Sequence, residues 1–294
     1  MGHPRFRSTD LAVEWKMHGT LAVNTPPVPG DRVYATFNHR HLRQYVGGVA
    51  WPTIGLAVAT WAVFIGSVTA FAMGHLPAWA LVVINSISNF YSFTVLHEAV
   101  HENIEGSGRG KLLTVVLGWA SGLLFLAPFP PFRVIHLTHH QHTNVPIKDP
   151  DIWVAGSNPL LILLRCLLIY PHYLYEYMIN FDKPISHKIK TLSIFLLYWG
   201  SATALLYTPL ADISLYGLIL PSILGTGLTA LLFDWLPHHP HKDQAIAGHT
   251  RNFPSRTLNV VLAGQNYHQL HHVNPRVPFH RYQEAFKASC VVKQ

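Results

Sequence analysis

The stretch GGVAWPTIGLAVATWAVFIGSVTAFAM, residues 47–73, is uncharged and long enough to cross a bilayer as a helix, which takes about 20 residues. A Gly-His-Leu-Pro link follows it, and a second apolar stretch covers residues 77–96. The pattern recurs later, where the apolar stretches 189–207 and 212–235 flank the short link 208–211. The sequence therefore predicts an all-α integral membrane protein with four transmembrane helices in two hairpins.

The composition agrees with a membrane protein. Only 12% of the residues are charged and 49% are hydrophobic, against roughly 25% charged residues in an average soluble domain. The two cysteines, Cys166 and Cys290, are too few for a disulfide framework and indicate a reducing compartment. The formal charge of +7 is spread among apolar runs, so we expect a positive cytoplasmic flank and no nucleic-acid partner.

Lys and Arg predict the orientation of the chain. Neither hairpin link contains one, whereas the segment before the first helix and the central loop contain Arg32, Arg40, Arg43, Arg133, Lys148, Arg165, Lys183, Lys188 and Lys190. By the positive-inside rule, both termini and the central loop are cytoplasmic. We therefore expect a cytoplasmic N-terminal segment, 1–46, without a cleavable signal, and one membrane domain, 47–294.

Two further apolar stretches, 111–132 and 159–179, lie between the hairpins and are interrupted by prolines. We expect interfacial or re-entrant helices there. A spanning role for the first stretch is the alternative.

Histidine is in excess, because its 21 copies equal the sum of Lys and Arg, and such an excess usually indicates metal binding. Three clusters stand out: His97-Glu-Ala-Val-His101, His136-Leu-Thr-His139-His140 and His268-Gln-Leu-His271-His272. Residues three or four apart share one helix face, with Cβ atoms about 5–6 Å apart. Both imidazoles of a pair can then bind one ion, and imidazole suits iron, zinc and copper.

All three clusters fall on the side of the membrane that Lys and Arg alone assign to the cytoplasm. At the end of the last span, Asp234 and His238 lie four residues apart at the same face and form a fourth candidate. A buried pair that closes the helix end is the alternative for them. We predict no metal role for the remaining candidates, which lack the spacing, crowd a proline or lie at the opposite face: His142, His239, His241, His249 and His75.

The three clusters resemble the histidine boxes of the membrane fatty-acid desaturase and hydroxylase superfamily, in order and approximate separation. That resemblance covers the chain from about residue 47 onward. It implies two iron ions held by the boxes, together with a polar residue and a histidine four apart on the last membrane helix. Asp234 and His238 occupy that place, although Asn is often found where Asp234 stands.

Details around the boxes are similar to cyanobacterial-type β-carotene hydroxylases. These details are the segments 233–240, 252–255 and 262–272, Pro275 and Pro278, and the segment 136–144 followed by Asp149-Pro-Asp151. The first box is less similar, since Glu98 stands where Asp is expected and Glu102 where Gly is common. The resemblance implies hydroxylation of a β-carotene ring, and an acyl-chain desaturase or decarboxylase with the same iron site is the alternative.

Oxidising an unactivated C–H bond with O2 requires a metal cofactor, because no protein side chain is reactive enough. The sequence has no dinucleotide fingerprint and no clustered cysteine ligands, so the electron donor is expected to be a separate protein such as a ferredoxin.

Acidic side chains near the boxes are expected to orient the imidazoles through the second ring nitrogen: Glu98, Glu102, Asp149 and Asp151. An ordinary turn is the alternative for Asp149-Pro-Asp151. A set of aromatic residues lines a substrate channel or simply packs between helices: Trp61, Phe64, Phe90, Tyr91 and Phe93. A metal transporter is less favoured, because transport places ionisable residues within the spans and these spans are almost free of them.

Overall fold

The computed structural model describes residues 36–37, 39–106, 111–246 and 248–291. The first part of this chain forms β1 (Thr36–Phe37), α1 (His39–Leu42), η2 (Arg43–Tyr45), α2 (Trp51–Ala72), α3 (Ala78–Val100), α4 (Leu112–Leu124) and α5 (Phe129–His142). The middle forms η3 (Pro150–Val154), α6 (Pro159–Leu167), α7 (Ile169–Ile179), α8 (Ile185–Leu205), η4 (Ile213–Ile219), α9 (Leu220–Thr229) and η5 (Ala230–Trp235). The last part forms α10 (Arg256–Val261), α11 (His268–Val273), η6 (Phe279–Arg281), α12 (Tyr282–Ser289) and β2 (Cys290–Val291). The predicted all-α fold is confirmed apart from one antiparallel pair of two-residue strands, β1 and β2.

Three helical segments of the described chain are long and apolar enough to cross a membrane: α2, α3 and the continuous run Ile213–Trp235. Three of the four predicted spans are therefore confirmed as helices able to cross a membrane. The fourth predicted span, α8, is helical but not apolar enough to be counted with these three, because Lys188 and Lys190 near its start lower its mean hydropathy. Of the most apolar part of α2, 17% is buried inside the molecule, against 67% for α3. Helix α2 therefore offers most of its surface to lipid, and α3 is central.

Buried polar side chains connect the long helices. The Ser67 hydroxyl of α2 donates to Asn85 Oδ1 of α3 at 2.6 Å, and Asn85 Nδ2 donates to the Gly217 carbonyl at 3.0 Å. Gly217 lies in the π-helical turn η4, where the regular α-helical hydrogen bonding is interrupted. Because backbone polar groups inside a membrane must be satisfied within the protein, Asn85 both joins three segments and provides a partner for this carbonyl.

The first apolar stretch between the hairpins does not form one straight helix. Helices α4 and α5 are bent by 96° relative to each other. Gly118 makes this bend possible, because a Cβ atom there would lie 2.7 Å from the Phe129 ring. The geometry is that of a broken span or a re-entrant pair, so both alternatives that the sequence left open are compatible with it.

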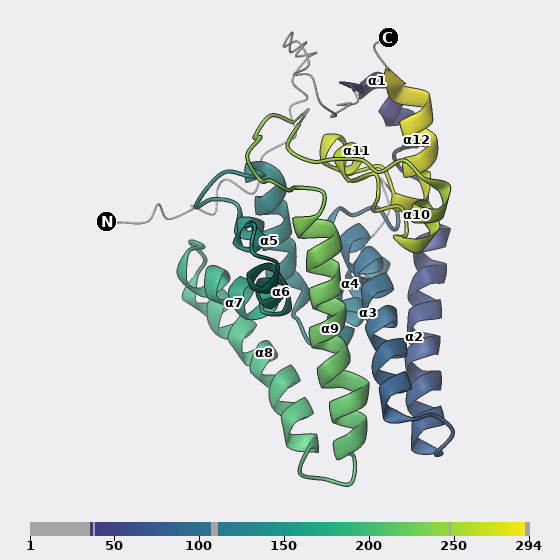
Figure 1. The fold of residues 1–294 in the computed structure, drawn as a ribbon, viewed down its shortest axis with the longest axis vertical. Coiled ribbons are helices and arrows are strands. Elements are labelled where there is room, and N and C mark those ends of the chain that lie inside the picture. Colours follow the sequence, from purple (N-terminus) through teal and green to yellow (C-terminus); the bar gives the residue numbers. More distant parts are fainter. Residues whose placement is uncertain (1–35, 38, 107–110, 247, 292–294) are drawn as a thin grey trace.

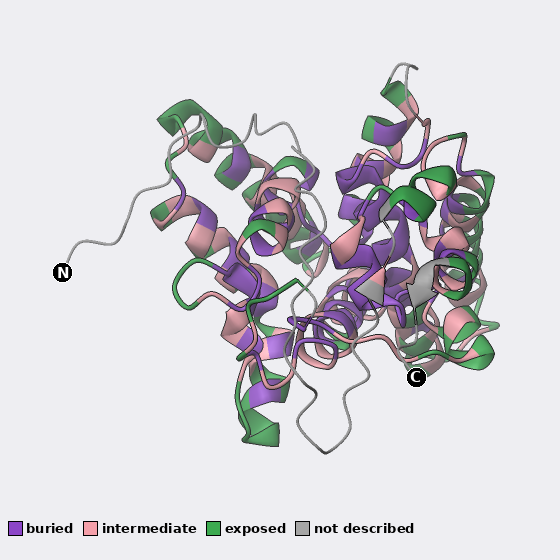
Figure 2. Cartoon of the chain, turned by 90° about the horizontal axis from the view of Figure 1, so that it is seen from above, coloured by how far each residue is buried: buried purple, intermediate pink, exposed green. Residues whose placement is uncertain are grey.

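The links α2–α3 and α8–η4 lie at one end of the bundle, and α5, α10, α11 and α12 lie at or near the other (Figure 1). At that second end Leu42 of α1 is buried against Tyr267, Leu270 and Tyr282. Viewed from above, buried segments lie toward the middle of the molecule and exposed ones toward the outside (Figure 2). Residues 1–35 of the predicted N-terminal segment lie outside the described residues.

Candidate metal centre

Four segments bring nine histidines together at one end of the bundle. His97 and His101 lie at the end of α3, and His238 follows η5; α5 supplies His136, His139 and His140, and α11 supplies His268, His271 and His272. His140 is half-buried and the other eight are buried. The predicted meeting of these segments at one end of the bundle is therefore confirmed. His75, in the α2–α3 link, lies at the opposite end.

The first group contains five histidines whose ligand atoms all lie within 4.8 Å of one another: His97, His101, His136, His140 and His271. The Nε2 atoms face one another. His136 Nε2 lies 3.0 Å from both His101 Nε2 and His140 Nε2. His140 Nε2 lies 2.9 Å from His271 Nε2. This group therefore combines all three boxes around one point.

The second group contains the four remaining histidines, again with ligand atoms within 4.8 Å: His139, His238, His268 and His272. His268 Nε2 lies 3.0 Å from His238 Nε2 and 3.1 Å from His272 Nε2, and His139 Nε2 lies 3.4 Å from His272 Nε2. No histidine belongs to both groups. The nine predicted histidines thus divide into two separate sets of five and four.

Both groups suit a metal ion. Imidazole nitrogens bind a first-row ion at about 2.0–2.1 Å, so two of them at right angles on one ion lie about 2.9 Å apart, close to the separations observed. His97 is buried, and neither of its ring nitrogens has a hydrogen-bond partner among the described residues. A buried polar group without a partner costs about 1–3 kcal/mol. A metal ion would remove that cost for His97.

Burial also favours the neutral imidazole that a metal requires. Burial lowers the pKa values of His268, His271 and His272 well below the ordinary value of 6.5, and neighbouring histidines lower them further. The same cause lowers the pKa of His238. These side chains are therefore neutral at pH 7, and metal binding does not have to displace their protons.

Asp149 orients His139. Its Oδ1 accepts from His139 Nδ1 at 2.8 Å, and its Oδ2 accepts from the Asn144 backbone N–H at 2.6 Å. Asp151 Oδ2 lies 3.2 Å from the same His139 nitrogen, and Asp151 Oδ1 accepts from the Tyr173 hydroxyl at 2.6 Å. With Nδ1 held in this way, Nε2 of His139 faces the second group. Asp149 also caps η3 by accepting from the Asp151 backbone N–H at 3.0 Å, so the carboxylate is part of a turn and a partner of histidine.

The structure gives the other predicted acidic residues different partners. Glu98 Oε1 lies 3.4 Å from Asn103 Nδ2 and 3.3 Å from the Phe279 backbone nitrogen, so it connects α3 to the C-terminal segment. Glu102 pairs with three cations, Lys111, Arg133 and Arg276. The prediction that these two carboxylates orient imidazoles gains no support from these contacts.

Asp234 also lies outside both histidine groups. Asp234 and His136 line the same cavity, and Asp234 also contacts Tyr173. The predicted α-helical spacing between Asp234 and His238 does not apply, because residues 230–235 are π-helical and turns follow them. Only His238 of this pair joins a group.

Sequence reasoning missed two residues whose hydroxyl oxygens lie near a histidine Nδ1 atom. The Tyr282 hydroxyl lies 2.8 Å from His271 Nδ1, and Thr143 Oγ1 lies 3.4 Å from His272 Nδ1. Each pair joins residues of different elements or turns, so no local spacing announces the contact.

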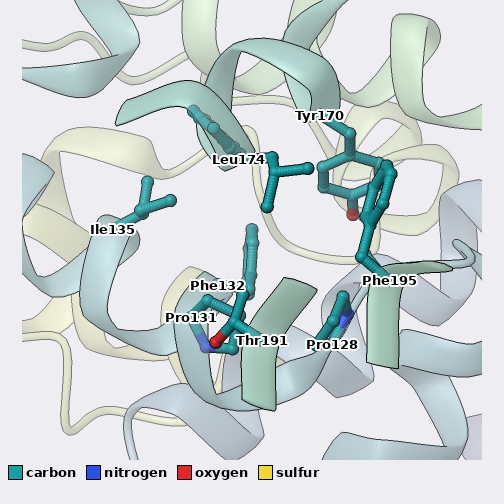
Figure 3. Close-up of a pocket in the computed structure, with 10 residues that line it drawn as sticks. Pro128, Pro131, Phe132, Ile135, Tyr170, Leu174, Thr191 and Phe195 are labelled. Atoms are coloured by element: carbon teal, nitrogen blue, oxygen red, sulfur yellow. The ribbon is translucent and has the colours of Figure 1, made fainter. Parts of the chain in front are cut away.

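An apolar pocket lies among α5, α7 and α8. In Figure 3 Phe132, Tyr170, Leu174 and Phe195 surround it. A second cavity shares three lining residues with the first, Phe132, Tyr170 and Tyr173, and extends to His136 and Asp234. The two spaces therefore lie side by side, and the second reaches a histidine of the first group.

The aromatic residues that the sequence suggested for a channel are placed differently. Of them, Phe93 lines the second cavity. Trp61 and Phe64 pack edge to face with centroids 5.7 Å apart, and Phe90 packs against Tyr91 and Phe233. Packing is thus the role the structure gives to most of this set.

Comparison with known proteins agrees with the site. Residues 73–289 match the model of the Fatty acid desaturase family. The chain is 25% identical over 218 residues to sphingolipid delta(4)-desaturase DES1 of Xenopus tropicalis. The aligned region covers 68% of this chain and 61% of that protein. It is also 25% identical over 258 residues to fatty acid desaturase 3 of Bos taurus, and that aligned region covers 74% of this chain and 56% of that protein. The chain thus spans about three fifths of the length of these relatives. Because the family match covers most of the chain, the protein belongs to the fatty acid desaturase family.

Proposed function

We propose that this membrane oxidoreductase holds two iron ions, one in each histidine group, and uses O2 to oxidise a C–H bond of a lipid-soluble substrate. The observation that carries the proposal is the division of nine histidines into two converging groups beside an apolar cavity. When bound, the two ions supply the oxidising power that no side chain has. His97, His101, His136, His140 and His271 would hold one ion, and His139, His238, His268 and His272 the other.

The chain's own residues would place the substrate. The two adjoining cavities form a mainly apolar path from Thr191 and Phe195 on α8 toward His136. Phe132 stacks on His136 at a centroid distance of 5.8 Å, and Phe93 stacks on His97 at 5.5 Å. These rings exclude water from one side of the first group. A hydrocarbon chain or ring would fit this path better than a polar substrate.

Asp234 is the acidic side chain that lines the second cavity. We place it as a partner for a polar group of the substrate or for a proton, in contact with Tyr173. This role differs from the ligand role that the helical spacing suggested.

Two substrate classes remain, each with its own support. The residues around the second and third boxes, including the segment 262–272, support ring hydroxylation of β-carotene through their resemblance to β-carotene hydroxylases. Both relatives described above are named desaturases, which supports desaturation of an acyl chain.

A separate protein such as a ferredoxin would deliver the electrons to a cytoplasmic active site. Lys111, Arg133 and Arg276 surround Glu102 and leave an excess of positive charge there. Burial lowers the pKa of His101, and His136, Arg133 and Arg276 add to this effect, so the two arginines lie near the first group. An acidic electron carrier is the partner whose charge matches this surface.

Metal analysis of the purified protein tests the di-iron proposal. We expect close to two irons per chain, one for each group. His139→Ala and His271→Ala each remove one ligand, from the second and the first group respectively, and should abolish turnover while the protein remains folded in the membrane. Full activity in either variant, or zinc as the sole stoichiometric metal, would contradict the proposal.

Expression in cells that accumulate β-carotene, and separately in cells supplied with defined fatty acids, tests the substrate. Hydroxylated carotenoids in the first cells support ring hydroxylation. Unchanged β-carotene together with new double bonds in the acyl chains supports the desaturase alternative. The His271→Ala variant, expressed in parallel, controls for oxidation by the host.

A further inference from the structure

His249 lies beside the second histidine group although it belongs to none of the three boxes. It is 5% exposed, and its ring centroid lies 5.0 Å from that of His272. It is also within electrostatic reach of the other three members, His139, His238 and His268. A fifth imidazole therefore stands next to the group that contains four.

His249 has a ring nitrogen available for an ion. Its Nε2 is buried without a hydrogen-bond partner in the described part of the chain. Burying a polar atom without a partner is unfavourable, and an ion bound at Nε2 would remove that cost.

Asn144 fixes the position of the loop that contains Asp243 and His249 relative to the second histidine group. Its Nδ2 lies 2.8 Å from the His249 carbonyl and 2.7 Å from the Asp243 carbonyl. Its backbone N–H donates to Asp149 Oδ2 at 2.6 Å, and Asp149 in turn holds His139. One residue thus connects the His249 loop to the carboxylate that orients a member of the second group.

The neighbouring His241 provides a comparison. It too is buried, and its ring lies 6.1 Å from that of His238. However, its Nε2 lies 3.3 Å from the Asp234 carbonyl, and of the second group it reaches His238 and His139 electrostatically. His241 is therefore similar in burial and residue type but less central to the group.

We infer that His249 is a fifth imidazole ligand for the ion of the second group, which gives both ions the same number of histidines. This inference rests on the proposed di-iron function. His249 is not part of the set whose ligand atoms lie within 4.8 Å of one another, so its ring must move toward the ion to bind it.

The test measures retention of iron by the purified full-length protein and does not depend on turnover. Protein loaded with ⁵⁷Fe is challenged with a chelator, and the two ions are followed by Mössbauer spectroscopy. In His249→Ala one of the two ions should be released about 10- to 100-fold more readily than in the wild type, and its spectrum should change. The other ion should be unaffected. His249→Gln, which conserves polarity and most of the volume, repeats the test if the alanine variant does not fold.

His241→Ala is the matched control and should retain both ions as the wild type does. Added imidazole should restore retention in His249→Ala and have no effect on His241→Ala. Unchanged retention and spectra in a folded His249 variant would overturn the inference, and so would equal losses in both variants. A wild-type protein that binds no iron would instead refute the proposed function itself, so the two failures are distinguishable.

Discussion

Replacing Asp149 by asparagine should weaken the second metal site without removing any of its histidines. All the hydrogen bonds described above reach Asp149 from donors: His139 Nδ1 and the Asp151 backbone on Oδ1, and the Asn144 backbone on Oδ2. Asparagine has nearly the same shape but offers one oxygen and one NH2 group. Whichever way the amide turns, one donor faces another donor, and His139 loses the nearer of its two carboxylate partners, keeping Asp151 at 3.2 Å.

The size of the effect follows from these contacts. A hydrogen bond to a charged group contributes about 1.5–3 kcal/mol, which corresponds to a change of about 10- to 150-fold in an equilibrium constant. Removal of a carboxylate that orients a metal-bound histidine costs about 10- to 100-fold in metal affinity. We therefore expect Asp149→Asn to release the second ion at a 10- to 100-fold lower chelator concentration by this estimate, with the first ion retained.

The assay is chelator titration of the purified protein with iron measured by mass spectrometry. Asp182→Asn, at an exposed position in the loop between α7 and α8, is the control and should match the wild type. Asp149→Asn protein that is folded and releases both ions at the wild-type chelator concentration would refute the idea that this carboxylate supports the site.

Three further predictions concern the end of the last span, the cavity and pH. His238→Ala should reduce the iron content from about two to about one per chain and stop catalysis. His239→Ala should change neither, because only His238 belongs to a histidine group. Equal iron losses in both variants would show that His238 is not a ligand. Thr191→Trp should fill the cavity between α5, α7 and α8 and lower turnover at least about tenfold, the scale of a hydrophobic pocket effect, with iron content unchanged; wild-type turnover would place the substrate elsewhere. The melting temperature of protein stripped of iron should fall as the pH drops below 6.5, the ordinary pKa of histidine. Burial lowers the pKa values of the α11 histidines, so the unfolded chain binds more protons than the folded one in this range. A flat melting temperature between pH 7 and 5 would contradict this.

The sequence was sufficient for the central part of the site because its signals are local and mutually consistent. Spacing of three or four residues placed His136 and His140 on one helix face, and the distribution of Lys and Arg independently brought the clusters to one end of the bundle. His238 was suggested by its place at the end of the last span and by its spacing from Asp234, and only the first of these agrees with the structure. What remained beyond reach depends on contacts between distant residues. Tyr282 meets His271, and Asn144 meets the His249 loop, across 105 positions in the latter case.

One expectation assumed regular α-helical geometry within an apolar run. The run ending at Trp235 is π-helical in its last turn, so Asp234 and His238 are not related by α-helical spacing. The apolar stretch 111–132, for which the sequence left a re-entrant and a spanning helix open, breaks after Leu124 and turns by 96°. Helix periodicity predicts which residues share a face only while the helix stays regular.

Helices α5 and α11 each supply histidines to both groups: α5 gives two to the first and one to the second, and α11 gives one and two. Within these two helices, the separation between ligands of the two ions is set by the rise and turn of the backbone. Helix α2 supplies no histidine to either group, so a bilayer of different thickness that tilts α2 would leave this separation unchanged. The electronic coupling between two bound ions should then respond little to such a tilt, even where the width of the substrate path does.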